Sequence, residues 1–197
     1  MKNIKIRITL IEEMLGMSPA DPEIYNAFIA SNAPDAPTRE EEIESIGVEA
    51  VQEKGTTIFP RIEDGTPFVW DYQIKGFFKD TVGMLRRIPG SACSKVKAFK
   101  KEIDGLLFVE ERKVPINTIG EIGLCQRPLR TDGPSGIRTA LASSETVAAG
   151  STIEFTLALM RDDMYAWVSE CLDYGYRRGL GQWRNSGKGR FIWEEVQ

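Results

Sequence analysis

The chain has 197 residues, a formal net charge of −4 and no histidine. The missing histidine removes the commonest general base, the usual catalytic triads and most zinc sites. Cys93, Cys125 and Cys171 form no CxxC pair, which argues against a zinc site or a disulfide framework and fits a cytoplasmic protein. No apolar run approaches the roughly 20 residues of a membrane span. We therefore expect one domain, residues 1–197, with an insertion at about residues 21–54, no cofactor, no metal and no membrane association.

The charge is unevenly distributed along the chain. Residues 1–64 hold 13 acidic and 6 basic side chains, residues 65–130 hold 7 and 12, and residues 131–197 hold 9 and 7. Two windows, Arg86–Lys101 and Tyr174–Trp193, contain no acidic residue. If these windows meet in space, they form a basic face on an acidic protein, which is the electrostatic footprint of a nucleic-acid-binding surface. Otherwise they are solvated surface.

The first half of the chain is predicted to mix short strands with helices. Alternating charged and β-branched residues predict a strand over residues 4–11, followed by a turn. The acidic insertion is expected to hold two helices, and the second begins with a capping-box pattern, Thr38 and Glu41. The remaining expected elements here are helices over residues 21–31 and 38–46 and strands over residues 56–60 and 67–70.

The middle of the chain predicts one long helix over residues 71–88. Its apolar positions recur at three- and four-residue spacing, which is the pattern of a helix packed on a core. These positions are Ile74, Phe77, Phe78, Val82 and Leu85. The following segment, residues 90–101, is polar and basic, and we expect no regular element there.

The second half predicts several strands, one helix and a final strand. The expected strands cover residues 105–109, 121–128, 140–147, 151–159 and 190–193, with a hairpin tip at 130–138 and a helix over 162–176. This order predicts an α+β fold with a ferredoxin-like, or RRM-like, antiparallel sheet and helices on one face. The acidic helical insertion and a C-terminal glycine-rich loop would be additions to that core.

The C-terminal loop is the most informative motif. Gly179, Gly181, Gly187 and Gly189 are interleaved with cations within a few residues. Such a loop suits phosphate binding, because its amide groups and cations can meet the same anion, but it also fits a plain glycine-rich turn with solvated charges. It has neither the Walker order nor the setting of a dinucleotide fingerprint. Trp183 could stack on a base or pack beneath the loop, and both remain open.

Three segments of the chain together resemble the RAMP superfamily, the RRM-like proteins of CRISPR–Cas complexes, and most closely its backbone-subunit type. They are the strand over residues 4–11 followed by Leu15-Gly16, the segment from Gly65 to Arg87 and the segment from Ser151 to Phe191. In the second, Lys75-Gly76 occupies the lysine–glycine position of an xxKGxxR-type helix start, and Lys79 stands where an arginine is often found. The third carries the C-terminal glycine-rich loop.

The resemblance implies a protein that binds single-stranded nucleic acid, RNA in preference to DNA, through the phosphate backbone. Endonuclease members of the family often use a histidine, and this chain has none, so we expect a non-catalytic protein. CRISPR-complex subunits, or copies of the chain in a filament, are the implied protein partners, and the character of the chain suggests a phage or prophage member. The resemblance and the basic windows together give these candidate nucleic-acid-binding residues: Lys75, Lys79, Arg86, Arg87, Gly179, Gly181, Trp183, Arg184, Gly187, Lys188, Gly189 and Arg190.

Two alternatives belong to other functional classes. The first is a phage-borne mimic of a CRISPR subunit that inhibits through protein contacts, with the six glutamates of residues 38–53 presented to a basic partner. The second is a metal-dependent nuclease built from carboxylates. Its candidate residues are Asp21, Asp71, Asp80, Asp162 and Asp163, although adjacent aspartates before a helix more often act as N-terminal caps.

Overall fold

The computed structural model of the chain describes residues 1–20, 56–133 and 136–196. The helices expected at 21–31 and 38–46, and with them the whole acidic insertion, lie outside these residues. The chain divides into two compact units, which we describe one at a time. The first unit comprises Met1–Met14, Pro60–Glu121 and Val147–Gln197, and the second comprises Leu15–Phe59 and Ile122–Thr146.

The first unit is built on an antiparallel sheet with the strand order β11-β1-β10-β7-β5, and β6 also pairs with β10. The strands are β1 (Lys2–Leu10), β5 (Phe68–Trp70), β6 (Leu107–Val109), β7 (Lys113–Asn117), β10 (Thr152–Leu159) and β11 (Phe191–Val196). The helices are α4 (Asp71–Leu85), α5 (Phe99–Leu106) and α6 (Met164–Arg178), with short 3₁₀ turns η1 (Ala92–Lys95) and η2 (Arg184–Ser186).

Strand β1 is a central strand of the sheet, and its side chains alternate in character. Ile4, Ile6, Ile8 and Leu10 are buried on one face, and the intervening charged residues point to the other face. The strand pairs with β10 on one side and with β11 on the other. The strand expected over residues 4–11 is therefore confirmed.

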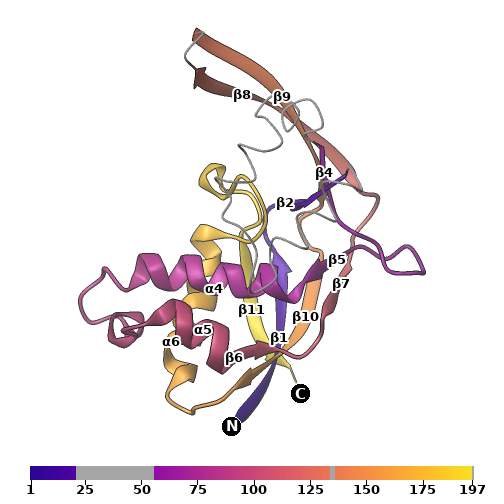
Figure 1. The fold of residues 1–197 in the computed structure, drawn as a ribbon. Helices are drawn as coiled ribbons and strands as arrows, with labels where there is room; N and C mark the ends of the chain where they lie inside the picture. Colours follow the sequence, from indigo (N-terminus) through magenta and orange to yellow (C-terminus); the bar gives the residue numbers. More distant parts are fainter. Residues whose placement is uncertain (21–55, 134–135, 197) are drawn as a thin grey trace. The chain divides into compact units, whose positions relative to one another are not determined.

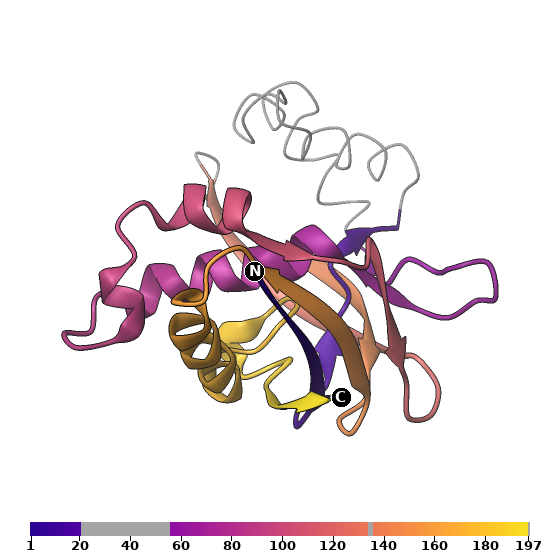
Figure 2. The same ribbon diagram turned by 90° about the horizontal axis from the view of Figure 1, so that it is seen from below.

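Helices α4 and α6 cover the apolar face of this sheet. The five apolar positions expected along α4 are all buried. Figures 1 and 2 show α4 and α6 packed beside the strands, and the two helices contact each other. Ile8 of β1, Phe155 of β10, Phe77 of α4 and Leu172 of α6 line one small apolar cavity. The predicted α+β class, with an antiparallel sheet and helices on one face, is confirmed.

Two elements of the first unit were not expected from the sequence. Strand β7 contains Pro115, which would normally interrupt a strand, but this residue pairs with Phe68 of the short strand β5 at the end of the sheet. Helix α5 begins at Phe99, inside the segment for which no regular element was expected. The strand expected at residues 105–109 correspondingly starts only at Leu107.

The second unit holds a sheet with the order β2-β9-β4-β3, in which β8 also pairs with β9. Its strands are β2 (Met14–Leu15), β3 (Ser18–Pro19), β4 (Thr56–Ile58), β8 (Gly123–Gly133) and β9 (Gly136–Val147). Strands β8 and β9 form the antiparallel hairpin whose tip was expected near residues 130–138, whereas β4 runs parallel to β9. Gly16 lets the chain approach β4, since a Cβ there would lie 2.6 Å from the carbonyl carbon of Ile58.

None of the helices in the described ranges combines the length and the apolar character that crossing a membrane requires.

The packing of α6 on β11 gives a test of the first unit. A Cβ at Gly175 would lie 2.2 Å from the ring of the buried Phe191. We expect Gly175→Ala to lower the free energy of unfolding by about 1–3 kcal/mol, because it overpacks a tight core. Gly76→Ala in α4, where a Cβ meets no atom within 4 Å, is the control and should be neutral or stabilising by up to about 1 kcal/mol. Urea denaturation measures both, and equal stabilities would contradict the packing.

Candidate functional site

The glycine loop, residues 179–190, folds back on itself through close backbone contacts. Gly179, Gly181, Gly187 and Gly189 all have positive φ angles, and so does Trp183 at 54°. The Leu180 N–H donates to the carbonyl oxygen of Gly189 at 2.8 Å. A Cβ at Gly189 would lie 1.7 Å from the carbonyl oxygen of Leu180. The glycines are therefore required for the shape of the loop itself.

The loop is fastened to the chain that leaves β1. The Gly189 N–H donates to the carbonyl oxygen of Glu13 at 2.8 Å, and the Ile11 N–H donates to the carbonyl oxygen of Arg190, also at 2.8 Å. These bonds extend the pairing of β1 with β11 beyond the end of the sheet. As a result, the side chains of Glu12 and Glu13 lie beside the basic residues of the loop.

Each cation of the loop has a carboxylate partner inside the first unit. Arg190 contacts Glu12 at 2.9 Å, and Lys188 contacts Glu13. Arg184 contacts Asp80 of α4 at 2.9 Å. A phosphate group at this loop would therefore have to displace or share a carboxylate. Trp183 is 41% exposed, so its side chain is only partly packed against the protein.

Asp80 is the acidic centre of this arrangement, because it accepts hydrogen bonds from two arginines. Arg178 at the end of α6 donates to it at 2.8 Å, in addition to Arg184. Burial alone would raise the pKa of Asp80, but the two guanidinium groups outweigh burial and hold it below its usual value. The carboxylate thus ties α4, α6 and the glycine loop together.

The two lysines of the α4 motif also have partners within the first unit. Lys75 Nζ donates to the carbonyl oxygen of Asp104 at 3.1 Å and lies 4.8 Å from the centroid of the Phe108 ring. Partial burial lowers the pKa of Lys75. Lys79 contacts the Asp104 carboxylate at 2.5 Å. The phosphate contacts that the resemblance implies for both lysines remain a prediction.

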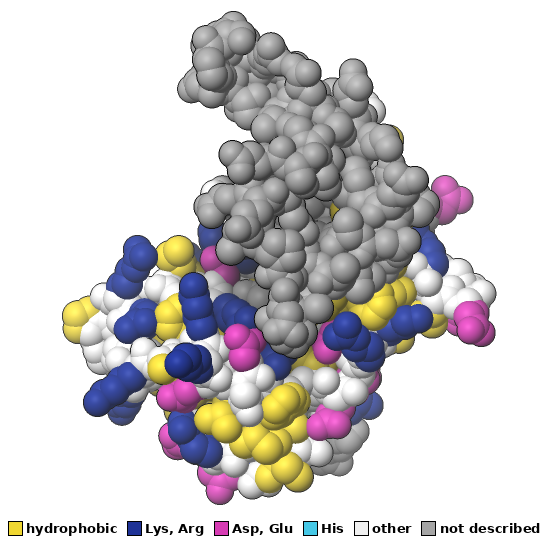
Figure 3. Space-filling view, in the orientation of Figure 1, with side chains coloured by type: hydrophobic (Ala, Val, Ile, Leu, Met, Phe, Trp, Pro, Cys, Tyr) yellow, Lys and Arg dark blue, Asp and Glu magenta, His cyan; other side chains and the backbone are white. Residues whose placement is uncertain are grey.

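The basic segment, residues 86–101, has a different character. Its six cations are all exposed, and none forms an ion pair with a residue in the described ranges. Arg86 lies over the ring of Phe99, 5.1 Å from the centroid. Figure 3 shows dark-blue side chains gathered at the end of the molecule formed by α4 and α5. The six are Arg86, Arg87, Lys95, Lys97, Lys100 and Lys101.

Buried apolar side chains anchor the basic segment to the rest of the first unit. Cys93, Val96 and Ile103 are buried, and the exposed lysines fall between them. The spacing of these anchors and Phe99, every three or four residues, is the signal in the sequence that could have revealed the ordered turn and α5. Of the candidate residues expected from the sequence, Arg86 and Arg87 belong to this segment.

The two acid-free windows of the sequence both reach helix α4. The second window contacts α4 through Asp80, whereas the first begins at its C-terminal end with Arg86. Arg86 lies six positions after Asp80, which corresponds to about 9 Å along a helix axis. The exposed cations of the first window therefore begin close to the paired cations of the second.

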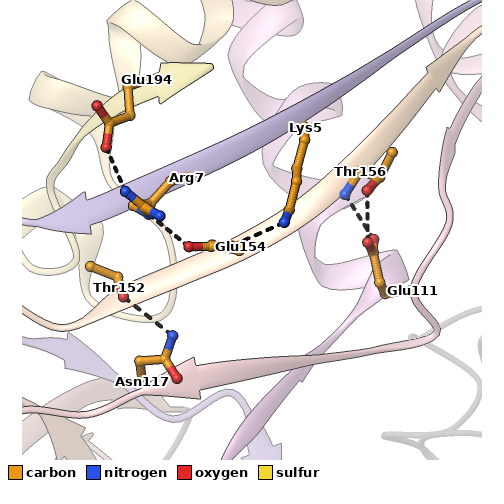
Figure 4. Close-up of polar contacts among 8 residues, drawn as sticks. All are labelled: Lys5, Arg7, Glu111, Asn117, Thr152, Glu154, Thr156 and Glu194. Carbon is orange, nitrogen blue, oxygen red and sulfur yellow. Dashed lines mark hydrogen bonds and ion pairs between the residues drawn. The ribbon is translucent and has the colours of Figure 1, made fainter. Parts of the chain in front are cut away.

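The face of the sheet opposite the helices carries cross-strand ion pairs (Figure 4). Arg7 of β1 contacts Glu154 of β10 at 2.7 Å and Glu194 of β11 at 3.1 Å, and Lys5 contacts Glu154 at 3.4 Å. On β1 and β10, which are described in full, the only aromatic side chain is Phe155, and it is buried on the helix side. These two strands therefore offer no ring on which a base could stack.

The carboxylates considered for metal-dependent cleavage are dispersed. Asp71 pairs with Arg112 at 2.5 Å, and Asp163 pairs with Arg161 at 3.0 Å, without a capping hydrogen bond to α6. Asp21 lies outside the described residues. In the part of the chain that the structure describes, no three acidic, cysteine or histidine side chains are grouped as a metal site would require.

Comparison with solved structures finds similar folds in chains of two CRISPR complexes. A chain in the cryo-EM structure of the Type III-B Cmr-beta bound to cognate target RNA superposes with a TM-score of 0.54 at 12% identity, covering 99% of this chain. This chain spans only 58% of that one. A chain of a Type IV-B CRISPR complex gives a TM-score of 0.51 at 13% identity, with 99% of this chain and 90% of that chain covered. No protein-family model and no curated protein matches the sequence. The fold is therefore similar to that of CRISPR complex subunits, and a phage or prophage origin stays a prediction.

The arginine contacts of Asp80 predict a pH-dependent stability. Its pKa is lowered in the folded chain, so the stabilisation is present above the unfolded value near 3.8 and is lost as the pH falls below it. We expect Asp80→Asn to lower the free energy of unfolding by about 1–3 kcal/mol at neutral pH. The difference from the wild type should shrink in acid.

Asp104→Asn is the matched control, because Asp104 is 57% exposed and pairs with one lysine. It should cost less than about 1 kcal/mol. Denaturant titrations of the three proteins across pH would measure this, and an Asp80 effect that does not change with pH would contradict the ion-pair assignment.

Proposed function

We propose that this protein is a non-catalytic nucleic-acid-binding protein of RAMP-like, ferredoxin-like fold, which binds single-stranded RNA through the phosphate backbone. The observation that carries the proposal is the basic segment. It exposes six cations without an acidic residue between them, on a protein whose net charge is −4. A local concentration of lysine and arginine attracts phosphates even when the protein as a whole is acidic.

The strand order of the first unit supports the ferredoxin-like assignment. With β11-β1-β10-β7 in the sheet, α4 following β1 and α6 preceding β11, the elements occur in βαββαβ order. Similarity to a chain from a structure described as bound to target RNA supports RNA over DNA as the ligand. CRISPR-complex subunits or further copies of this chain are the protein partners that fit this proposal.

In this proposal the basic segment and the glycine loop have unequal roles. The segment provides exposed cations that have no ion-pair partner among the described residues and can meet phosphates directly. The loop cations are held by Glu12, Glu13 and Asp80, so each can bind a phosphate only by displacing its carboxylate or by sharing the cation with it. Each loop cation therefore binds phosphate more weakly than a cation of the basic segment does. The main contribution of the loop is to fix α4 in position.

The basic segment gives a direct test by salt titration. We expect Arg87→Ala combined with Lys97→Ala and Lys101→Ala to weaken binding and to flatten the slope of log K against log salt by about two units. Each phosphate contact on a single strand contributes about 0.7. Fluorescence anisotropy with labelled single-stranded RNA, single-stranded DNA and duplex would measure this.

A charge-matched triple variant controls for the loss of net charge. Lys2, Arg61 and Lys113 are exposed and lie outside both acid-free windows, so their combined replacement by alanine should leave the slope nearly unchanged. Equal losses in both triple variants would show that only overall charge matters. An unchanged slope in the segment variant would remove the basic segment from the interface.

The glycine loop is tested at Lys188. We expect Lys188→Ala to weaken binding similarly for all sequences and to flatten the salt slope by about 0.7 unit, the value for one lost phosphate contact on a single strand. Glu13→Gln keeps the lysine but removes its carboxylate partner, so this variant should bind more tightly. If neither variant changes affinity, Lys188 has only a structural role in the loop.

A further inference from the structure

Two cysteine thiols lie together where the basic segment packs against α6. Cys93 is on η1 and Cys171 is on α6, with their sulfur atoms 3.7 Å apart. Both side chains are fully buried. The third cysteine, Cys125, belongs to the second unit and is partly exposed. The chain therefore contains a close thiol pair and a separate thiol that serves as an internal reference.

The thiol pair lies at the contact that attaches η1 to α6. The carboxylate of Glu170 accepts hydrogen bonds from the Ser91 hydroxyl at 2.8 Å and from the Cys93 N–H at 2.9 Å. Burial would raise the pKa of Glu170, but these donors hold it below its usual value. One turn of α6 thus holds η1 through a carboxylate and a thiol. The exposed cations Lys95 and Lys97 follow Cys93 immediately.

We propose that Cys93 and Cys171 form a reversible redox modification site, which is oxidised to an intramolecular disulfide by a small-molecule disulfide such as glutathione disulfide. The bond joins η1 to α6 and holds the basic segment in one arrangement. Its effect on nucleic-acid binding rests on the function proposed above, whereas the formation of the bond does not.

The reaction is two successive thiol–disulfide exchanges. One cysteine loses its proton and attacks the small disulfide, so that a mixed disulfide forms and one thiol leaves with that proton. The second cysteine then attacks the mixed disulfide in the same way, and a second thiol leaves. The two cysteines lose two electrons and two protons in total, and the small disulfide gains both.

Geometry and burial set the conditions for this exchange. A disulfide needs a sulfur–sulfur distance of about 2.05 Å, so the two atoms must approach by less than 2 Å. Burial raises the pKa of the Cys171 thiol and suppresses the reactive thiolate. Exchange therefore requires η1 to lift from α6 first, and the bond then keeps η1 closed.

The effect of the disulfide on stability should be measurable without any nucleic acid. The two cysteines are 78 residues apart, so the bond closes a long loop and restricts the unfolded chain. We expect a rise in Tm on the order of 10 °C for the oxidised protein. Local opening of the segment should also fall, so that trypsin cuts after Lys95 and Lys97 many-fold more slowly.

The experiment starts with the full chain, fully reduced and then equilibrated in buffers of increasing glutathione disulfide content. Free thiols are blocked with an alkylating reagent in denaturant, and intact mass with peptide mapping locates the bond. Relative to the reduced chain, we expect the protein to lose two hydrogen atoms before alkylation. Cys93 should then be linked to Cys171, and only Cys125 should be alkylated. Cys125→Ser should behave like the wild type, whereas Cys93→Ser and Cys171→Ser should lose the bond and the protection from trypsin.

The outcomes separate this inference from the proposed function. If Cys93 and Cys171 remain thiols in oxidising buffer, or if one of them pairs with Cys125, the inference is wrong whatever the protein binds. If the bond forms, anisotropy with single-stranded RNA should show severalfold tighter binding, because the cations are preorganised. A bond that protects the segment without changing RNA affinity supports the redox site and counts against the basic segment as the interface. The wild-type peptide map decides the question even if a serine variant fails to fold.

Discussion

The pairing of β1 with both β10 and β11 is the constraint on which the first unit depends. It brings the start of the chain beside two strands from its C-terminal part, and it places Glu12 and Glu13 against the glycine loop. The loop can follow this path only because Gly179 and Gly189 lack side chains where the backbone closes on itself. From the other side, Asp80 holds α6 and the loop to α4. The position of every candidate cation on α4 and in the loop follows from these contacts.

The distribution of partners, more than the number of charges, distinguishes the two basic windows. Cations of the glycine loop are balanced by carboxylates that the fold brings to them from distant parts of the chain. Cations of the basic segment have no such partner among the described residues, and Glu102, the acidic residue that follows the segment in the sequence, is paired with Arg161. A cation without a protein partner can neutralise a phosphate and so release a counterion condensed on the nucleic acid, whereas a paired cation first loses an existing contact.

Local patterns were sufficient to predict much of the fold. The alternation in β1 and the three- and four-residue spacing in α4 and α6 report burial directly, and each of these elements was found. The sequence did not reveal β7, because the tolerance of Pro115 depends on its pairing with Phe68. It also did not reveal α5, whose anchors lie among many lysines. The carboxylate partners of the loop could not be predicted either, since Glu13 and Lys188 are 175 positions apart and meet only in the folded chain.

The same strand order affects how the chain can fold during synthesis. Ile8 of β1 pairs with Ile153 of β10, so 145 residues of chain separate the two partners. At about 5–20 residues per second, β1 would wait roughly 7–30 s for the ribosome to supply β10, and longer for β11. During that interval its backbone edges and four buried aliphatic side chains have no native strand beside them. We therefore expect nascent chains to depend on chaperones and to be most prone to aggregation before β10 emerges.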